Sequence, residues 1–226
     1  MNLAPYLDHT LLRAEATPAQ IRQLCAEAAE HQFASVCVPP CYVRLAAEQL
    51  LDSDVPVCTV VGFPLGYSLA KLKFFEAHLA LTDGARELDM VINVGALKAG
   101  ELAEVEEEIG QLAELCHFRG AILKVILETA LLTGAEIVTA CQLCAEAGAD
   151  FVKTSTGFAS RGASVADVEL MRQSLPADVR IKAAGGIRTR AAALALVAAG
   201  ADRLGSSNSL ALLQEDETPT AETPTA

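Results

Sequence analysis

The sequence predicts an α/β fold in which eight strand–helix units form a single (β/α)8 TIM barrel. Short runs rich in Val and Ile alternate with stretches of helical period, which is typical of a parallel sheet with helical crossovers. A weak internal repeat returns at a spacing of 52 residues, which is about two strand–helix units. Eight units fill about 213 residues, close to the lower size limit for such a barrel. A doubly wound open sheet is the structural alternative.

The strand-like segments are short and bounded by polar or Gly-containing stretches. They are 6–10, 35–38, 57–63, 87–93, 121–128, 151–155, 180–184 and 203–206, of which the first is the weakest. Helical stretches lie between them, among others at 17–30, 101–115, 134–147, 164–174 and 189–199. Thr17 before Pro18, and Ser164, are plausible helix starts because a hydroxyl caps the first turn and Pro suits its first position.

The repeat couples a helix end to the strand that follows it. A Gly just past the helix suits the left-handed conformation that ends helices, and five residues later comes a residue inside the next strand. The pairs are Gly84 and Asp89, Gly148 and Lys153, and Gly200 and Gly205, with Gln32 and Cys37 as a degenerate fourth.

Composition excludes several classes of protein. Hydrophobic residues make up 52% of the chain, enough for a large core, and the net charge of -12 disfavours binding to nucleic acid or to anionic membranes. No apolar run reaches the roughly 20 residues of a spanning helix, and we expect no signal peptide. The seven scattered cysteines then indicate reduced thiols and a cytoplasmic location. Residues 1–213 are expected to form the barrel domain and 214–226 a disordered acidic Thr/Pro tail.

Three of the six lysines lie inside apolar strands, and this is the first chemical signal. They are Lys124, Lys153 and Lys182, and Asp89 lies in the strand before them. One strand lysine alone would most simply point to solvent or pair with an acid. Helices cover the outside of a barrel, however, so a lysine would be buried on either face. We therefore expect these charges to be paired and functional.

The spacing of these residues predicts a mechanism. Lys153 and Lys182 lie at similar heights on adjacent strands, which are about 4.8 Å apart. A neighbouring cation and desolvation both lower the pKa of an amine, and a shift of about three units corresponds to roughly 4 kcal/mol. Such an amine forms an imine with a carbonyl, and Asp89 would move protons. Lys124, predicted to share a strand face with Glu128, would be a supporting residue. This is aldol chemistry, for which we expect neither metal nor cofactor.

Glycine and hydroxyl residues follow the last three strands and predict a phosphate site. Loops after the seventh and eighth strands often bind phosphate in (β/α)8 barrels, through backbone N–H groups that only Gly lets an anion approach. The alternative interpretation is a set of tight turns with helix caps. The candidate residues are Thr156, Gly157, Gly185, Gly186, Ser206 and Ser207.

Longer motifs at these positions resemble one known family. FVKTSTGF at 151–158 resembles the Schiff-base strand of the deoxyribose-phosphate aldolases. The resemblance extends over nearly the whole predicted barrel. Its other motifs are LDHTLL at 7–12, VVGFPLG at 60–66, ELDMVIN at 87–93, LKVILET at 123–129, IKAAGGIR at 181–188 and GSS at 205–207.

The resemblance implies a cytoplasmic, homo-oligomeric class I aldolase. It would reversibly cleave 2-deoxy-D-ribose 5-phosphate to D-glyceraldehyde 3-phosphate and acetaldehyde, a step in deoxyribonucleoside and deoxyribose phosphate catabolism. Lys153 matches the imine-forming lysine, Lys182 the lysine that perturbs its pKa and transfers protons, and Asp89 the proton donor and acceptor. The phosphate-binding positions of the family are matched by Gly185, Gly186, Ser206 and Ser207. Two positions differ from many members, since Ala159 replaces a Gly and Asn208 a Ser.

Two other functions are compatible with the sequence. One is another Schiff-base sugar-phosphate aldolase with a different acceptor, and the other is a sugar-phosphate-binding barrel without catalysis. Cys141 and Cys144 have metal-ligand spacing but lie in a helical stretch, where core packing is the better interpretation. The acidic run that ends at Glu108 is expected to form a solvated helix face.

Overall fold

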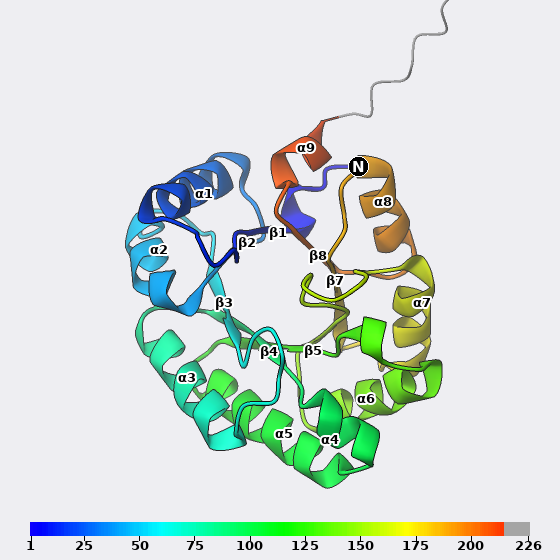
Figure 1. Ribbon diagram of the computed structural model, residues 1–226. Helices are drawn as coiled ribbons and strands as arrows, with labels where there is room; N and C mark the ends of the chain where they lie inside the picture. The colour runs from blue at the N-terminus through cyan, green and yellow to red at the C-terminus, as the bar shows by residue number, and fades with distance from the viewer. Residues whose placement is uncertain (215–226) are drawn as a thin grey trace, which may run out of the picture.

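Eight parallel strands close into a barrel in chain order, with each strand hydrogen-bonded to the next and β8 to β1 (Figure 1). The computed structural model describes residues 1–214, so most of the predicted tail (215–226) lies outside the described residues. The β1–β8 pairing confirms the TIM barrel and rules out the doubly wound alternative. The strands are β1 (Leu7–Thr10), β2 (Ser35–Val38), β3 (Val57–Val61), β4 (Glu87–Val91), β5 (Ile122–Ile126), β6 (Phe151–Lys153), β7 (Arg180–Ala184) and β8 (Arg203–Ser206).

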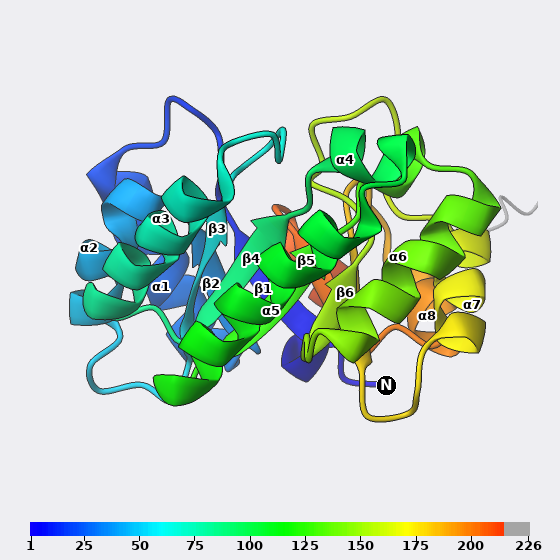
Figure 2. The same ribbon diagram turned by 90° about the horizontal axis from the view of Figure 1, so that it is seen from below.

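Helices form a ring around the strands, as both views show (Figures 1 and 2). Within the described residues, no helix is long and apolar enough to cross a membrane. The α-helices are α1 (Pro18–His31), α2 (Val43–Gln49), α3 (Ala70–Thr82), α4 (Val94–Ala99), α5 (Leu102–Phe118), α6 (Gly134–Glu146), α7 (Val165–Ser174), α8 (Arg190–Ala198) and α9 (Ser209–Leu213). Short 3-10 turns are η1 (Ala4–Tyr6), η2 (Pro40–Tyr42) and η3 (Thr129–Leu131).

Local hydrogen bonds define the helix ends. The Thr17 hydroxyl accepts a hydrogen bond from the backbone N–H of Gln20, whose side chain accepts from the Thr17 N–H in return, so α1 begins with a capping box. The Ser164 hydroxyl likewise accepts from a backbone N–H in the first turn of α7. Gln32 ends α1 with a φ of 53°, in the same left-handed region as the glycines of the repeat at 84, 148 and 200. The degenerate fourth copy of the repeat is therefore structurally equivalent to the other three.

The main apolar core lies between the strands and the helix ring, whereas the inside of the barrel holds charged side chains beside a small apolar cluster of Cys37, Cys58 and Val60. Leu88, Val125 and Ile181 are fully buried members of that outer core. Their strand neighbours Asp89 and Lys124 are also fully buried but are charged. Because side chains alternate across a strand, this parity places the charged residues together inside the barrel.

Two expectations about glutamates are wrong. Strand β5 ends at Ile126, and Glu128 takes a left-handed conformation with a φ of 57°. Glu128 therefore leaves the strand and does not share the inward face with Lys124. Glu108 is not on a solvated face, because it is buried and pairs with the buried Lys73 of α3 at 2.9 Å. The sequence pattern did not predict this partner, which is 35 residues away. Cys141 and Cys144 are buried in α6, as expected for core packing.

Candidate active site

Asp89 is the centre of a buried ion network inside the barrel. Its Oδ2 atom accepts hydrogen bonds from Lys153 Nζ at 2.7 Å and from Lys182 Nζ at 2.6 Å. Its Oδ1 atom accepts from Lys124 Nζ at 2.9 Å. The strand register pairs Lys153 with Lys182, so the predicted neighbours are brought together. All three predicted catalytic residues and the supporting Lys124 therefore meet at one carboxylate.

A second layer of charges lies next to this centre. Asp8 of β1 contacts Lys182 Nζ at 2.5 Å and Arg203 at 2.6 Å. Glu87 of β4 contacts Lys124 Nζ at 2.6 Å and Arg203 at 3.3 Å. These pairs close a ring of alternating charges around the barrel interior. The sequence argument did not assign roles to Asp8, Arg203 or Glu87, although the same alternation along β1, β8 and β4 places them inside.

The network contains one more cation than anion. Its cationic members are the three lysines and Arg203, and its anionic members are Asp8, Glu87 and Asp89. Buried charges without partners are costly, so the surplus suits a site that releases a proton or receives an anion.

The carboxylates control the protonation of this network. Burial alone would raise the pKa of Asp89, but Lys124, Lys153 and Lys182 outweigh it and hold that pKa well below its usual range. Burial alone would lower the pKa of Lys182, but Asp8 and Asp89 outweigh it and hold that pKa above its ordinary value. Asp89 is therefore a carboxylate and Lys182 an ammonium at neutral pH. Lys182 supplies a fixed positive charge beside Lys153.

A cavity of about 810 Å³ opens at the carboxyl-terminal ends of the strands. Among the three strand lysines, Lys153 alone lines this cavity, while Lys124 and Lys182 are fully buried behind it. Of the three lysines, Lys153 is therefore the one that a substrate carbonyl in the cavity would meet. Access to the cavity distinguishes Lys153 from Lys124 and Lys182, whereas the alternation of side chains along the strands does not.

The predicted phosphate residues all line the same cavity. Gly185 and Gly186 have φ values of 88° and 75°, so side chains there would be strained. A Cβ atom on Gly162 would lie 2.0 Å from the Gly185 carbonyl oxygen, so the loops after β6 and β7 are in direct contact. Arg188 also lines the cavity and was not predicted. The lining residues from the prediction are Thr156, Gly157, Gly185, Gly186, Ser206 and Ser207.

Glu128 organises the loop that follows the nucleophile strand. Its Oε2 atom accepts hydrogen bonds from both the backbone N–H and the hydroxyl of Thr156. The Thr156 hydroxyl in turn accepts from the Phe158 N–H at 3.0 Å. The Phe158 ring meets Phe63 edge to face at 5.3 Å. Glu128 therefore fixes the turn that carries cavity residues, a role that its left-handed backbone makes possible.

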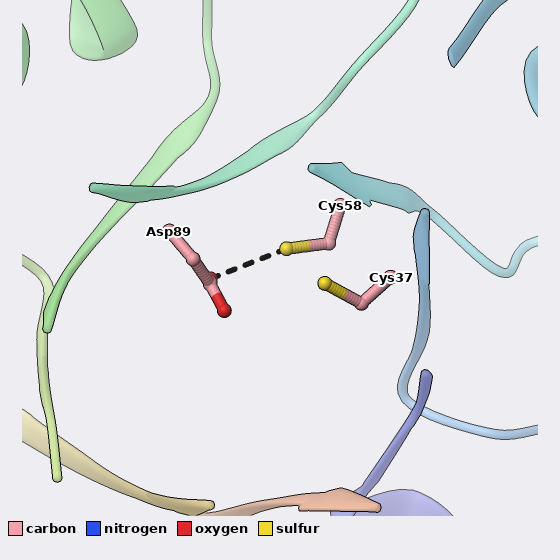
Figure 3. A group of neighbouring side chains, drawn as sticks. All are labelled: Cys37, Cys58 and Asp89. Atoms are coloured by element: carbon pink, nitrogen blue, oxygen red, sulfur yellow. Dashed lines mark hydrogen bonds between the residues drawn. The ribbon is translucent and has the colours of Figure 1, made fainter. Parts of the chain in front are cut away.

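Cys37, Cys58 and Asp89 point toward one another inside the barrel (Figure 3). Their donor atoms lie within 4.8 Å of one another, which raises the question of a metal site. Asp89, however, already accepts hydrogen bonds from the Nζ atoms of three lysines, and Lys124 Nζ is 3.3 Å from the Cys58 sulfur. An added cation would be repelled by these charges. The donor set therefore suits lysine chemistry better than metal binding.

Comparison with known proteins agrees with this geometry. The model of the DeoC/LacD aldolase family matches residues 3–213. A deoxyribose-phosphate aldolase of Clostridium novyi (strain NT) is 51% identical over 214 residues, which cover 95% of this chain and 96% of the relative. One of Bacillus cereus (strain AH187) is 51% identical over 216 residues, with 96% of each chain covered. The tetrameric deoxyribose phosphate aldolase of Aeropyrum pernix is 34% identical, with a TM-score of 0.87 over 93% of this chain and 89% of that one.

Proposed function

This chain belongs to the DeoC/LacD family of aldolases, and from that premise we propose that it is a class I deoxyribose-phosphate aldolase. It cleaves 2-deoxy-D-ribose 5-phosphate reversibly into D-glyceraldehyde 3-phosphate and acetaldehyde through an imine on Lys153. Lys153 is assigned as the nucleophile because it is the strand lysine that is accessible from the cavity. Lys153 lines the cavity and contacts Asp89, whereas the two other strand lysines are sealed behind it.

The first step forms the imine. Lys153 Nζ attacks C1 of the open-chain sugar, and water leaves as the C–N double bond forms. An ammonium and an aldehyde give a protonated imine and water, so the total charge inside the barrel does not change. Asp89 can therefore remain the counter-ion throughout, at the position where it now accepts from Lys153. Transient protons pass between Lys153, Asp89 and Lys182, which share one carboxylate oxygen.

The second step breaks the bond between C2 and C3 of the sugar. The bonding electrons move to C2 and give an enamine, while the C3 hydroxyl loses its proton and becomes the aldehyde of glyceraldehyde 3-phosphate. C2 then takes up a proton, and water hydrolyses the resulting imine to acetaldehyde. A water molecule in the cavity would take the proton of the C3 hydroxyl and return it to C2, because Lys182 does not line the cavity. The positive charge of Lys182, held by Asp8 and Asp89, would favour the release of that proton.

The phosphate is expected at the loops after β6, β7 and β8. Backbone N–H groups at Gly185 and Gly186, with the Ser207 hydroxyl, suit a phosphate dianion, and Arg188 adds a positive charge on the cavity wall. This placement sets the aldehyde end of a five-carbon sugar toward Lys153. Binding energy from the phosphate would then orient the bond to be cleaved.

Borohydride trapping tests the assignment. Protein incubated with 2-deoxy-D-ribose 5-phosphate and sodium borohydride should retain a reduced adduct on the peptide that carries Lys153, and Lys153→Met should retain none. Adduct on Lys124 or Lys182 would overturn the roles assigned to the three strand lysines. No adduct in folded wild-type protein would favour a binding barrel without catalysis. Product analysis separates the remaining rival, because an aldolase with a different acceptor would not release glyceraldehyde 3-phosphate together with acetaldehyde.

We propose that the enzyme acts in the cytoplasm and that it is a homo-oligomer. All seven cysteines are free thiols, which suits a reducing compartment. The relative from Aeropyrum pernix is tetrameric, which supports an oligomer for this chain as well. The net negative charge disfavours nucleic acid as a partner.

A further inference from the structure

A second buried ion pair lies outside the barrel, away from the lysines of the active site. Lys73 of α3 is fully buried, and its Nζ atom is 2.9 Å from Glu108 Oε2 of α5, the neighbouring helix in the ring (Figure 1). Burial lowers the pKa of Lys73 and raises that of Glu108, and in both residues it outweighs the attraction of the partner. A buried pair of this kind contributes little net stability, so the other contacts of Lys73 better explain its presence.

Lys73 binds the backbone at the end of β4. Strand β3 ends at Val61, whose partner in the register is Met90, so Val91 lies one residue beyond the part of β4 that β3 pairs. Lys73 Nζ donates a hydrogen bond to the carbonyl oxygen of Val91 at 2.8 Å. The side chain therefore satisfies a buried carbonyl at the point where β3 turns away. Asp89 lies only two residues earlier on the same strand.

The same side chain supports the loop after β3. A Cβ atom on Gly62, which has a φ of 62°, would lie 2.7 Å from Lys73 Cε, so the alkyl chain of the lysine passes directly against this glycine. Glu76, three residues along α3, accepts a hydrogen bond from the Gly62 N–H at 2.8 Å. A Cβ atom on Gly66 would lie 1.9 Å from the carbonyl oxygen of Ile92, so the loop packs on the backbone just after β4. Helix α3 thus fixes this loop and the end of β4 as one unit.

The position of β4 matters because Asp89 makes short contacts with the reacting lysine. Its Oδ2 atom accepts from Lys153 Nζ at 2.7 Å and from Lys182 Nζ at 2.6 Å. A displacement of about 1 Å at a reacting group can lower a rate by about 100-fold, even when its cause lies far from the chemistry. The loops after β7 and β8, where the phosphate is expected, belong to other elements. A shift of β4 would therefore lower the rate of reaction more than the affinity for substrate.

We propose that Lys73 is a positioning residue that holds β4 so that Asp89 lies between the strand lysines. Lys73 does not line the cavity, and it acts through the carbonyl of Val91. Glu108 is its counter-ion in the buried site between α3 and α5. The effect on the rate rests on the proposed aldolase function, whereas the hold on β4 does not.

Replacing the ion pair by two apolar side chains separates positioning from stability. Lys73→Met/Glu108→Met should melt within about 3 °C of wild type, because apolar residues of similar volume are often as stable as a buried ion pair. With 2-deoxy-D-ribose 5-phosphate, its kcat should nevertheless be about 10-fold below wild type and its KM changed by less than about threefold, because the carbonyl of Val91 stays unbound. Lys98→Met is the matched control, since it removes the lysine of the exposed pair with Glu136 and should match wild type. A double variant with wild-type kcat overturns the proposal.

Glu108→Gln gives the converse result and decides the matter if the double variant does not fold. The amide oxygen of Gln can still accept from Lys73, which can still reach Val91. The kcat should therefore stay within about twofold of wild type although the melting temperature falls, because one charge of a buried pair is lost. A 10-fold loss of kcat in folded Glu108→Gln would refute the proposal, because activity would then follow the ion pair and not the contact with β4.

Hydrogen exchange distinguishes failure of this inference from failure of the proposed function. Wild-type protein that does not cleave 2-deoxy-D-ribose 5-phosphate would refute the function, and exchange would still test the hold on β4. Peptides from 88–93 contain the Ile92 N–H, which donates to the Ile126 carbonyl at 3.1 Å. They should exchange roughly 10-fold faster in Lys73→Met/Glu108→Met than in wild type, whereas peptides from β7 at 180–184 should not change. Equal exchange at 88–93 in the two proteins overturns the proposal.

Discussion

Replacing Asp8 by Asn changes the network at a residue that touches neither the cavity nor the reacting atoms. Asn has nearly the same shape as Asp, so the substitution removes a charge and leaves little empty space. Asp8 is fully buried and contacts Lys182 and Arg203. Without it, the excess of positive charge in the network rises from one to two.

The expected loss of stability follows from that excess. Removing one member of a buried ion pair typically costs about 3–5 kcal/mol, because the remaining charge lacks a partner. For a chain of this size the melting temperature falls roughly 2–4 °C per kcal/mol, so Asp8→Asn should melt roughly 6–20 °C lower than wild type. Differential scanning calorimetry at pH 7 measures the difference. Asp8→Asn/Arg203→Met should recover part of the loss, because the second substitution removes the uncompensated cation.

The stability that Asp8 contributes should depend on pH in a predictable direction. The pKa of Asp8 is held below its ordinary value, because Lys182, Arg203 and Lys124 outweigh the effect of burial. A lowered pKa stabilises the fold above the unfolded value, about 3.9, and that stabilisation is lost as pH falls through the folded value. The difference in free energy of unfolding between wild type and Asp8→Asn should therefore be the same at pH 7 and pH 5. It should become smaller below about pH 4. A loss under 1 kcal/mol at pH 7, or a purely additive double variant, would refute the network argument.

Four further predictions concern single side chains. Lys153→Arg should lower kcat by a factor on the order of 10⁴ or more, because guanidinium does not form the imine, and steady-state kinetics with a coupled aldehyde assay would detect it. Asp89→Asn should lower kcat by about 10²–10⁴ in the same assay, because proton transfer loses its shared carboxylate. Glu128→Gln should lower kcat/KM by about 10–100-fold, because charged hydrogen bonds to the loop are lost, whereas the exposed Glu107→Gln should match wild type. Native protein treated with maleimide at pH 7.5 should label first at Cys41, the exposed thiol, and mass spectrometry of Cys41→Ser should show no fast adduct.

Alternation along the chain was enough to predict the fold. The strand–helix order, the repeated helix ends and the hydroxyl caps are local signals, because each depends on residues a few positions apart. The period of two within a strand also indicated that Lys124, Lys153, Lys182 and Asp89 share the interior. The alternation can be recognised in a single sequence because strand geometry directs neighbouring side chains to opposite faces.

The limits of that prediction lie where a residue's partner is distant in the sequence. Glu108 was assigned to a solvated surface because its own helix gave no sign of Lys73, which comes from α3. Glu128 was assigned to a strand face because no local pattern shows that the backbone turns left-handed after Ile126. Both errors concern charged residues that are stabilised by contacts across the fold.

The amino-acid sequence was sufficient to indicate which side chains enter the barrel and what chemistry they suit. The folded structure was needed to show which lysine reaches the cavity, because accessibility depends on how the loops at the mouth of the barrel surround it. The protonation of Lys182 also depends on the fold, because Asp8 approaches from β1 only when the barrel closes onto β8. Local patterns record the direction of a side chain, whereas burial and electrostatic partners arise from elements that meet only in the folded chain.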